Sequence, residues 1–161
     1  LNSANAEGSV WTPQTIFDRP PSWKTNTAGF LNGLDADFLA VVGKTKKVTC
    51  RNTITDGGGS DTTEDRFFLL SRREMYAGDE ISSVIEGEPY PFYSDFSDLT
   101  AAGVGADTNR IKYRNGSASY WWLRTPTPWY GFNVRGVSPS GALYGNGASS
   151  AGGVAPVCNI I

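Results

Sequence analysis

The composition of the last 37 residues constrains this chain more than any other feature. From Thr125 to Ile161 there is no Lys, Glu, Gln, Met, Asp or His, although Lys, Glu, Gln and Met fill 13 of the preceding 124 positions. Gly, Ser, Asn, Pro, Val and aromatic residues replace them, and these residues favour turns and short strands over helices. We therefore predict that this C-terminal segment carries a binding surface and that the preceding residues form its scaffold.

The size of the chain suits one domain. It has 161 residues, of which 39% are hydrophobic, enough to bury a core without metal or disulfide staples. Nineteen glycines and 12% aromatic residues indicate short strands and many turns. We predict a single domain over residues 10–161, preceded by a linker remnant at residues 1–9.

Charge and hydropathy exclude several partners. The net charge is -2 and the isoelectric point is about 5.1, which gives no reason to expect nucleic acid as a partner. No apolar run is long enough to span a bilayer, so we expect no membrane insertion. The basic runs Lys44–Lys47 and Arg72–Arg73 are typical of solvated faces.

The residue types that most catalytic mechanisms need are missing or isolated. The chain has no histidine, the usual general base and metal ligand. Cys50 and Cys158 match no metal spacing, and the sequence leaves open whether they pair or stay free. Ser71 and Glu74 have the spacing of a helix capping box, which explains both without catalysis. We predict no enzyme activity and no cofactor.

Metal binding is not expected either. Four acidic residues lie in or near an acidic, aromatic stretch, but they lack the spacing of a calcium loop. These residues are Asp79, Glu86, Asp95 and Asp98.

The predicted elements are short. Two small helices are expected near the N-terminus, one capped by Thr25 or Asn26 with Phe30, Leu31 and Leu34 on its apolar face, and one over 35–42 that ends at Gly43. Residues 56–65 (DGGGSDTTED) should form a polar loop that lacks the Lys-Ser/Thr ending of a phosphate loop. The strands predicted from β-branched and apolar runs are 48–54, 66–70, 119–124, 134–137, 142–144 and 154–161.

Several motifs carry a family resemblance. FFLLSRREM, the acidic loop, GADTNRIKYRNGSASYWWLRTP, the VSPSGAL turn and GVAPVCNII resemble the variable proteins of diversity-generating retroelements in gut phages and bacteria. The likeness covers most of residues 48–161 and is most specific at Trp122–Pro126 and Gly153–Pro156, although Thr125 stands where Ser is commoner. The resemblance implies an α+β, C-type-lectin-like fold with short twisted antiparallel strands, two small helices near the N-terminus and long ordered loops.

The resemblance also offers a reason for the unusual composition. In such systems template adenines are copied with errors, so Asn codons ending in a pyrimidine change into a set that excludes Lys, Glu, Gln, Met and Trp. The upstream frequency of Lys, Glu, Gln and Met would predict about four of them in the C-terminal segment, which has none. Loops of small residues would produce the same absence. Trp129 is either framework or encoded by a codon with another ending.

The candidate ligand-binding positions lie between the framework motifs. They are the residues whose side chains no structural pattern explains. Tyr and Phe supply rigid contact area at such positions, while Ser, Asn and Gly adapt around them. The predicted variable residues, within about 127–152, are Thr127, Trp129, Tyr130, Phe132, Asn133, Gly136, Tyr144, Gly145, Asn146, Ser149, Ser150 and Gly152. If the aromatic members are instead core residues, the prediction fails. Trp121, Trp122 and Leu123 should be scaffold, with Arg124 fixing a turn through backbone carbonyls.

The resemblance implies a receptor-binding function. The expected partner is a protein or glycan on a cell surface, and the expected location is a phage virion tail or the surface of a bacterium. The oligomeric state stays open. Two alternatives are an enzyme like the formylglycine-generating enzymes, whose fold these variable proteins share but whose catalytic cysteines have no matching positions here, and a purely structural virion or cell-wall domain.

Overall fold

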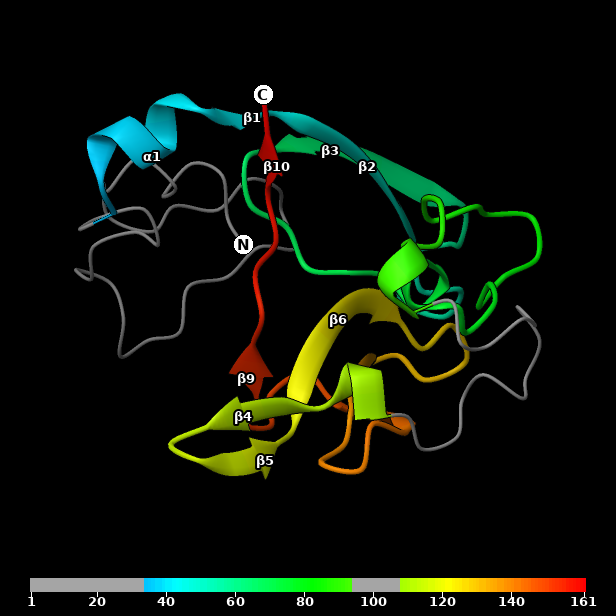
Figure 1. Cartoon of the computed structure of the whole chain (residues 1–161). Helices are drawn as coiled ribbons and strands as arrows, with labels where there is room; N and C mark the ends of the chain where they lie inside the picture. Colours follow the sequence, from blue (N-terminus) through cyan, green and yellow to red (C-terminus); the bar gives the residue numbers. More distant parts are fainter. Residues whose placement is uncertain (1–33, 94–107) are drawn as a thin grey trace. The chain divides into compact units, whose positions relative to one another are not determined.

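The computed structural model describes residues 34–93 and 108–161, which are coloured along the chain in Figure 1. Backbone contacts divide the chain into two compact units, of which the smaller contains residues 1–45, 65–68 and 158–161 and the larger residues 46–64 and 69–157. The predicted linker, and all but Leu34 of the first predicted helix, lie outside the described residues. The single-domain interpretation stays a prediction.

The smaller unit contains the one α-helix of the described residues. Helix α1 (Ala36–Ala40) begins after Asp35, whose carboxylate accepts hydrogen bonds from the N–H groups of Asp37 and Phe38 at 2.9 and 3.0 Å. The chain then enters β1 (Val42–Gly43), which pairs antiparallel with β10 (Asn159–Ile160).

A small core holds this unit together. Val42 and Phe67 are buried, and Leu34, Leu39 and Cys158 pack against them. The helix therefore ends early because Val42 and the following Gly43 enter a strand pair instead of a further helical turn.

A four-stranded sheet dominates the larger unit. Strand β6 lies between β7, its antiparallel neighbour, and β9, which is parallel to it. Strand β8 extends the sheet beyond β7 as a regular antiparallel partner. The strands are β6 (Trp121–Pro126), β7 (Asn133–Val137), β8 (Leu143–Gly147) and β9 (Gly153–Val154).

Strand β6 supplies the centre of the core because its side chains alternate. Trp121, Leu123 and Thr125 are buried, while the residues between them are half-buried. Val137 on β7 and Met75 are also fully enclosed. Burying a large apolar side chain contributes about 1.5–3 kcal/mol, so this row is a main source of stability.

Two hairpins form further two-stranded sheets in addition to the four-stranded sheet. Strands β2 (Thr45–Cys50) and β3 (Ser60–Asp65) form one pair, and β4 (Lys112–Arg114) and β5 (Ser117–Ser119) form the other. Asn115 and the following Gly116 turn the second hairpin with φ values of 51° and 79°, the left-handed region that Asn and Gly tolerate.

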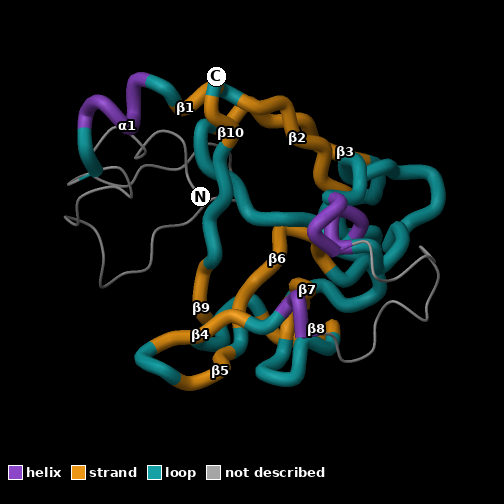
Figure 2. Tube along the Cα trace, viewed as in Figure 1, coloured by secondary structure: helices purple, strands orange, loops and turns teal. Residues whose placement is uncertain are grey.

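Single-turn 3-10 helices and loops connect the strands, as the coloured tube in Figure 2 shows. These helices are η2 (Arg73–Met75), η3 (Pro91–Tyr93) and η5 (Thr108–Arg110). In the part of the chain that is described, no helix is long and apolar enough to cross a membrane.

The predicted α+β, C-type-lectin-like fold with two small N-terminal helices is wrong. The described residues consist mainly of short strands in small sheets, with one five-residue α-helix and 3-10 turns. The expectation that the strands are antiparallel also fails at one place, because β6 and β9 run parallel. The helical spacing of apolar residues over 35–42 predicted a longer helix than the structure has, because Val42 pairs with Ile160 in a strand.

The loop predicted at residues 60–65 and the strand predicted at residues 66–70 are also wrong. The predicted polar loop contains β3, while the apolar run 66–70 lies outside every strand. The glycines Gly57, Gly58 and Gly59 all have φ near 70°, and the Arg51 N–H donates to the Gly59 carbonyl at 2.9 Å. The glycines thus close a hairpin, so polar Ser and Thr residues continue as its exposed second strand.

The predictions for the C-terminal half agree better with the structure. Strands β7 and β8 overlap the predicted ranges, and the Ser138 N–H donates to the Ala142 carbonyl at 2.8 Å across the predicted turn. The predicted terminal strand is divided into β9 and β10. Strand β9 pairs with β6, where Trp121 and Trp122 lie opposite Gly153 and Val154.

Candidate functional site

An exposed aromatic turn connects β6 to β7. Trp129, Tyr130 and Phe132 are 63%, 58% and 73% exposed. Residues 127–133, named here the aromatic turn, are closed by a backbone hydrogen bond of 2.9 Å from the Thr127 N–H to the Asn133 carbonyl. Three large aromatic side chains are thus held at the surface of a short, hydrogen-bonded loop.

The buried side chain of Asn52 fixes this turn. Its Nδ2 group donates to the carbonyl oxygens of Thr127 and Tyr130 at 2.9 and 2.8 Å. Its Oδ1 atom accepts from the N–H groups of Ile54 and Thr55 at 2.8 and 3.0 Å. Both amide protons and both lone pairs of Asn52 are therefore used, which joins two loops about 75 residues apart in sequence.

Thr53 supplies a second anchor for the aromatic turn. Its N–H and hydroxyl groups both donate to the Pro128 carbonyl, at 3.1 and 2.6 Å. On the other side of the turn, the Ala148 N–H donates to the Phe132 carbonyl at 2.9 Å. The backbone of the turn is thus bonded on both sides while its aromatic side chains stay exposed.

Ile54 extends the exposed apolar surface. Its side chain is 65% exposed, and a Cβ at Gly131 would lie 3.8 Å from it and 2.8 Å from Thr55. Gly131 therefore brings the aromatic turn against the loop that carries Ile54. Ile54 thus adds an exposed apolar side chain beside Gly131 of the aromatic turn.

The twelve predicted variable residues do not all lie at the surface. The exposed ones are Trp129, Tyr130, Phe132, Gly145, Asn146, Ser149 and Gly152. Asn133, Tyr144 and Ser150 are half-buried, whereas Thr127 and Gly136 are buried. The aromatic turn, strand β8 and the following loop thus provide most of the accessible candidates.

Three of these positions have little space for a different side chain. A Cβ at Gly136 would lie 2.6 Å from the Tyr144 ring and 2.9 Å from the Trp121 carbonyl oxygen. A Cβ at Gly152 would lie 2.4 Å from the indole nitrogen of Trp122. Thr127 is enclosed, and its hydroxyl has no hydrogen-bond partner among the described residues. The packing around these three positions leaves little room for a larger side chain.

Tyr144 joins a row of aromatic rings on the same sheet. Its ring lies 5.1 Å from that of Tyr120 in an edge-on contact and 6.0 Å from that of Trp122 in a stacked one. Loss of hydration, together with the neighbouring Tyr120, raises the pKa of the Tyr144 hydroxyl. Tyr144 therefore has both an exposed part and a structural contact.

A buried ionic cluster supports β6 at Arg124. Ser71 and Glu74 form the predicted capping box, with the Ser71 N–H donating to Glu74 at 2.8 Å and the Glu74 N–H to the Ser71 hydroxyl at 3.1 Å. The same Glu74 carboxylate also accepts from Lys47 at 2.8 Å and from Arg124. The capping box is thus confirmed, and its carboxylate links three segments.

Arg124 binds backbone carbonyls, as the sequence predicts. Its guanidinium donates to the carbonyl oxygens of Leu69, Val48 and Glu86 in addition to the Glu74 carboxylate. Five guanidinium N–H groups in a fixed plane suit this role, which a lysine would fill poorly. Arg124 is a structural residue.

A second buried carboxylate lies beside Thr125. Glu86 is 1% exposed and accepts from the Cys50 N–H at 2.9 Å and the Thr125 hydroxyl at 2.6 Å. The Thr125 hydroxyl in turn accepts from the Arg72 N–H at 2.9 Å. Burial raises the pKa of the Glu86 carboxyl, and these hydrogen bonds together with Arg124 only partly offset that effect.

A third carboxylate connects β7 to the rest of the framework. Glu80 forms ion pairs with Arg72 and with Arg135 on β7. Burial acts to raise the pKa of Glu80, but the hydrogen bonds and charges of the two arginines outweigh it and lower that pKa. Arg135, although it lies between candidate positions, is thus a framework residue.

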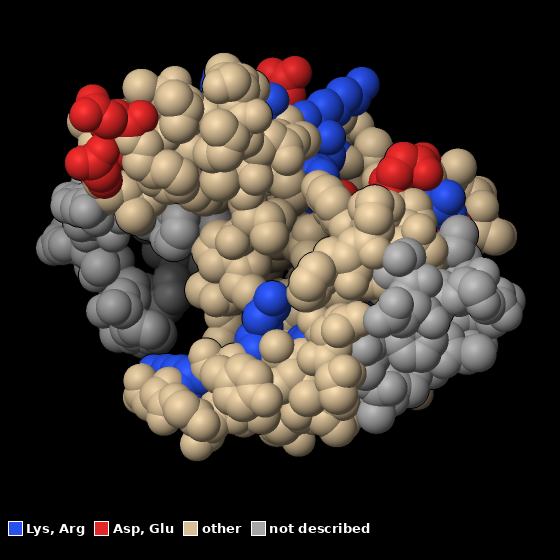
Figure 3. Space-filling model, viewed as in Figure 1, with Lys and Arg blue, Asp and Glu red and all other residues tan. Residues whose placement is uncertain are grey.

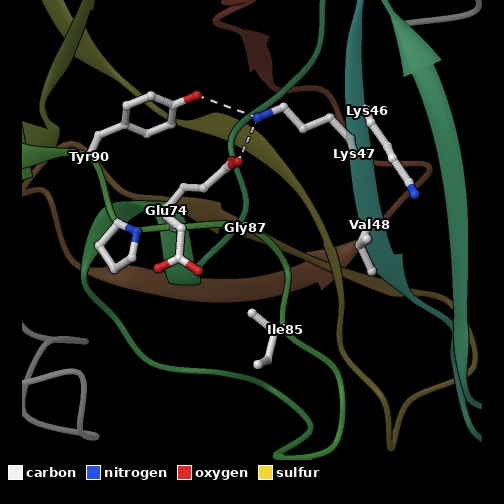
Figure 4. Close-up of a pocket in the computed structure, with 9 residues that line it drawn as sticks. Lys46, Lys47, Val48, Glu74, Ile85, Gly87 and Tyr90 are labelled. Atoms are coloured by element: carbon white, nitrogen blue, oxygen red, sulfur yellow. Dashed lines mark hydrogen bonds and ion pairs between the residues drawn. The ribbon is translucent and has the colours of Figure 1, made fainter.

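The polar pocket beside Glu74 is drawn in Figure 4. It has a volume of about 400 Å³ and is lined by residues of β2 and of the segment 85–90. The Lys47 amine points toward Glu74 and toward the Tyr90 hydroxyl, 3.4 Å away. The Glu74 carboxylate in this pocket is already paired with Lys47 and Arg124, so these side chains serve the framework.

The Cys50 thiol is a poor candidate for a reactive centre. Cys50 and Cys158 are both free thiols in the structure. Burial, and then the charge of Glu86, raises the pKa of the Cys50 thiol far above its usual range. A thiol that stays protonated at neutral pH is a poor nucleophile.

The acidic residues considered for calcium have other partners or lie outside the described residues. Asp79 pairs with Arg73 at 2.6 Å, and Glu86 is held by Thr125 and Cys50. Asp95 and Asp98 belong to the undescribed segment. In residues 34–93 and 108–161, no three side chains of the metal-ligating types come together.

Sequence reasoning missed the residues that hold the aromatic turn. Asn52 lies two residues after the end of β2, and the only sequence signal is that Asn favours bonding to backbone N–H groups two or three residues ahead. Its contacts with the aromatic turn are between residues 75 and 78 positions apart, which no local pattern reveals.

These features define a protein with a β-rich fold, a buried ionic cluster and an exposed aromatic turn. The chain belongs to the DUF6273 family, a domain of unknown function, whose model matches residues 2–161. Neither the comparison with curated proteins nor that with solved structures found a match.

Proposed function

We propose that this chain is a receptor-binding protein that presents a retroelement-diversified surface to a protein or glycan on a cell surface. The observation that carries the proposal is the aromatic turn, in which three aromatic side chains are more than half exposed while Asn52 and Thr53 fix the backbone. Rigid presentation lowers the ordering cost of binding, and exposed aromatic residues are the usual anchors of an interface.

The diversified surface comprises the accessible candidates and not the packed ones. It consists of the aromatic turn at Trp129, Tyr130 and Phe132 together with Gly145, Asn146 and Ser149. Substitutions of exposed side chains usually alter stability by less than ~0.5 kcal/mol. At Gly145 a new side chain would also require a small shift of Thr127, because its Cβ would lie 3.1 Å from the Thr127 hydroxyl oxygen. Gly136, Gly152 and Thr127 stay constant in this proposal because the framework contacts them closely.

The proposed setting is a phage tail or the surface of a bacterium, where such a protein would attach one particle or cell to another. The motifs Trp122–Pro126 and Gly153–Pro156 support this setting through their resemblance to variable proteins of retroelements. The alternative of a thiol-dependent enzyme has weaker support because the Cys50 thiol is buried and has a raised pKa.

A cell-binding assay tests the proposal. The fluorescently labelled protein, made multivalent on streptavidin, is incubated with a panel of gut bacterial strains and measured by flow cytometry. We expect binding to at least one strain, and its loss in a variant with Trp129→Ser, Tyr130→Ser and Phe132→Ser. The matched control, Phe92→Ser, removes a 66% exposed aromatic residue that lies outside residues 127–133 and should keep binding. Failure to bind any strain, or equal binding by the triple variant, would contradict the proposal.

A further inference from the structure

A second concave surface lies away from the aromatic turn. It has a volume of about 670 Å³ and is bordered by the β4–β5 hairpin, Pro139 and the segment 151–155. This size is within the range of sites for small ligands. Of the twelve predicted variable residues it contains only Gly152, so it is a separate site.

Two cations of β4 line this cleft. Lys112 and Arg114 are two residues apart on one strand, so their side chains leave the same face. The residues opposite them on β5 are the small Ser119 and Ser117, which leave the cations accessible. Lys112 is half-buried and Arg114 is exposed.

Neither cation has an acidic partner among the described residues. Arg124 and Arg135, by contrast, pair with Glu74 and Glu80. Residues 108–161 contain no Asp or Glu at all. In Figure 3 the part of this face over β4 and β5 accordingly shows basic side chains without acidic ones. The cleft thus has an uncompensated positive charge that favours an anion.

The wall beside the cations is aromatic and apolar. Tyr120 and Val154 are 51% and 56% exposed and line the cleft. The Tyr120 ring is held by its edge-on contact with Tyr144 at 5.1 Å. The Lys112 amine lies 5.9 Å from the ring centre of Trp121 at the base of the cleft, which restrains its position.

We propose that this cleft binds a sugar that carries an anionic group. The C–H face of a pyranose ring has partial positive charge and packs against the negative face of an aromatic ring such as Tyr120. The carboxylate or sulfate of the same sugar binds Lys112 and Arg114, because a guanidinium matches both anions in geometry. A neutral sugar would leave the two cations without a partner, and a simple inorganic anion would not use the aromatic wall.

Isothermal titration calorimetry with defined saccharides tests this inference. The probes are digalacturonate, galactose 6-sulfate and the neutral disaccharide galactobiose, each titrated to about 10 mM, where a millimolar Kd is still measured. We expect at least one acidic sugar to bind at least about tenfold more tightly than galactobiose, and its binding to weaken with added salt. The two acidic probes distinguish a carboxylate from a sulfate ligand.

Matched variants locate the binding site. Lys112→Gln with Arg114→Gln should weaken binding of the acidic sugar by about tenfold or more, and Tyr120→Ala should weaken it through loss of the wall. Lys44→Gln with Lys46→Gln removes the same charge at exposed residues outside the cleft and should leave the Kd unchanged. A thermal melt of each variant confirms that it is folded.

Three results would overturn the inference. They are equal binding of galactobiose and the acidic sugars, no binding of either acidic sugar by the folded protein, and unchanged binding by the Lys112 and Arg114 double variant. None of these results bears on the aromatic turn, because the residues of the two sites differ. Conversely, the triple serine variant of the aromatic turn should bind the acidic sugar with an unchanged Kd.

Discussion

The side-chain amide of Asn52 donates to the Tyr130 carbonyl at 2.8 Å, and this bond connects a buried loop residue to the most exposed aromatic segment of the described chain. The same amide also binds the Thr127 carbonyl. Asn52 therefore links the framework to the surface for which we propose a binding function. Changes at Asn52 should alter that surface without removing any of its exposed side chains.

The first prediction concerns this link. Replacing Asn52 with Ala leaves the carbonyls of Thr127 and Tyr130 without their donor, which costs about 1–3 kcal/mol for each buried group that stays unsatisfied. We expect a lower Tm and faster hydrogen exchange in residues 127–133. Asn159→Ala removes an exposed asparagine whose side chain donates only to the Thr45 hydroxyl, so it should lower the Tm much less and leave exchange in residues 127–133 unchanged. An Asn52→Ala protein with the Tm and the hydrogen exchange of wild type would show that the aromatic turn does not depend on Asn52.

The second prediction separates surface from scaffold. Trp129→Ser, Tyr130→Ser and Phe132→Ser, tested singly, should each change the free energy of unfolding by less than ~0.5 kcal/mol, since these side chains are exposed. Leu123→Ala, at a residue that is 1% exposed, should cost about 2–5 kcal/mol through the cavity it creates. Urea unfolding measures both. Similar losses in the two groups would mean that the aromatic turn belongs to the core.

The third prediction concerns which glycines can vary. Gly136→Ala places a methyl group 2.9 Å from the Trp121 carbonyl oxygen and should destabilise the protein by about 1–3 kcal/mol. Gly147→Ala is the control on the neighbouring strand, because the nearest atom to its Cβ is 3.7 Å away, and its effect should be small. Equal melting temperatures of the two variants would remove the structural reason for keeping Gly136 constant.

The fourth prediction uses two carboxylates with opposite pKa shifts. The pKa of Glu80 is lower in the folded state than the ordinary value of 4.5, so its stabilising contribution is present above that pH and lost as the pH falls through the folded pKa. The pKa of Glu86 is raised above 4.5, so its contribution is present below that pH and lost as the pH rises through the folded pKa.

Urea unfolding of wild type, Glu80→Gln and Glu86→Gln between about pH 3 and pH 8 measures both effects. The stability difference between wild type and Glu80→Gln should increase with pH, whereas that between wild type and Glu86→Gln should decrease. Using differences removes the contribution of the other acidic residues. If the two stability differences changed with pH in the same direction, the result would contradict the burial of Glu86 and the ion pairing of Glu80.

The sequence predicted local features well where the interacting residues are neighbours. The Ser71 and Glu74 capping box and the turn before Ala142 depend on contacts within five residues, and both are present. The burial of Trp121 and Leu123 follows from alternation along one strand. These elements are determined by local hydrogen bonding and by the two-residue period of a strand.

The remaining features depend on distant partners. Residues 60–65 form a strand because β2 lies beside them, although their polar composition is typical of a loop. Asn52 and Glu86 owe their roles to atoms at least 36 positions away. Exposure of the aromatic turn, and the burial of Gly136 within the same predicted variable set, likewise depend on which strands pair.

The central claim is that the exposed residues of the C-terminal segment are diversified while the framework stays constant. Sequencing the DNA around the coding region, and aligning any imperfect repeat of codons 119–161, tests this most directly. We predict a repeat near a reverse transcriptase gene that has adenines where the coding copy differs from it in the codons of Tyr130, Phe132 and Ser149, and that is identical at the codons of Leu123 and Gly136. Absence of such a repeat, or differences spread equally over the framework codons, would contradict the account.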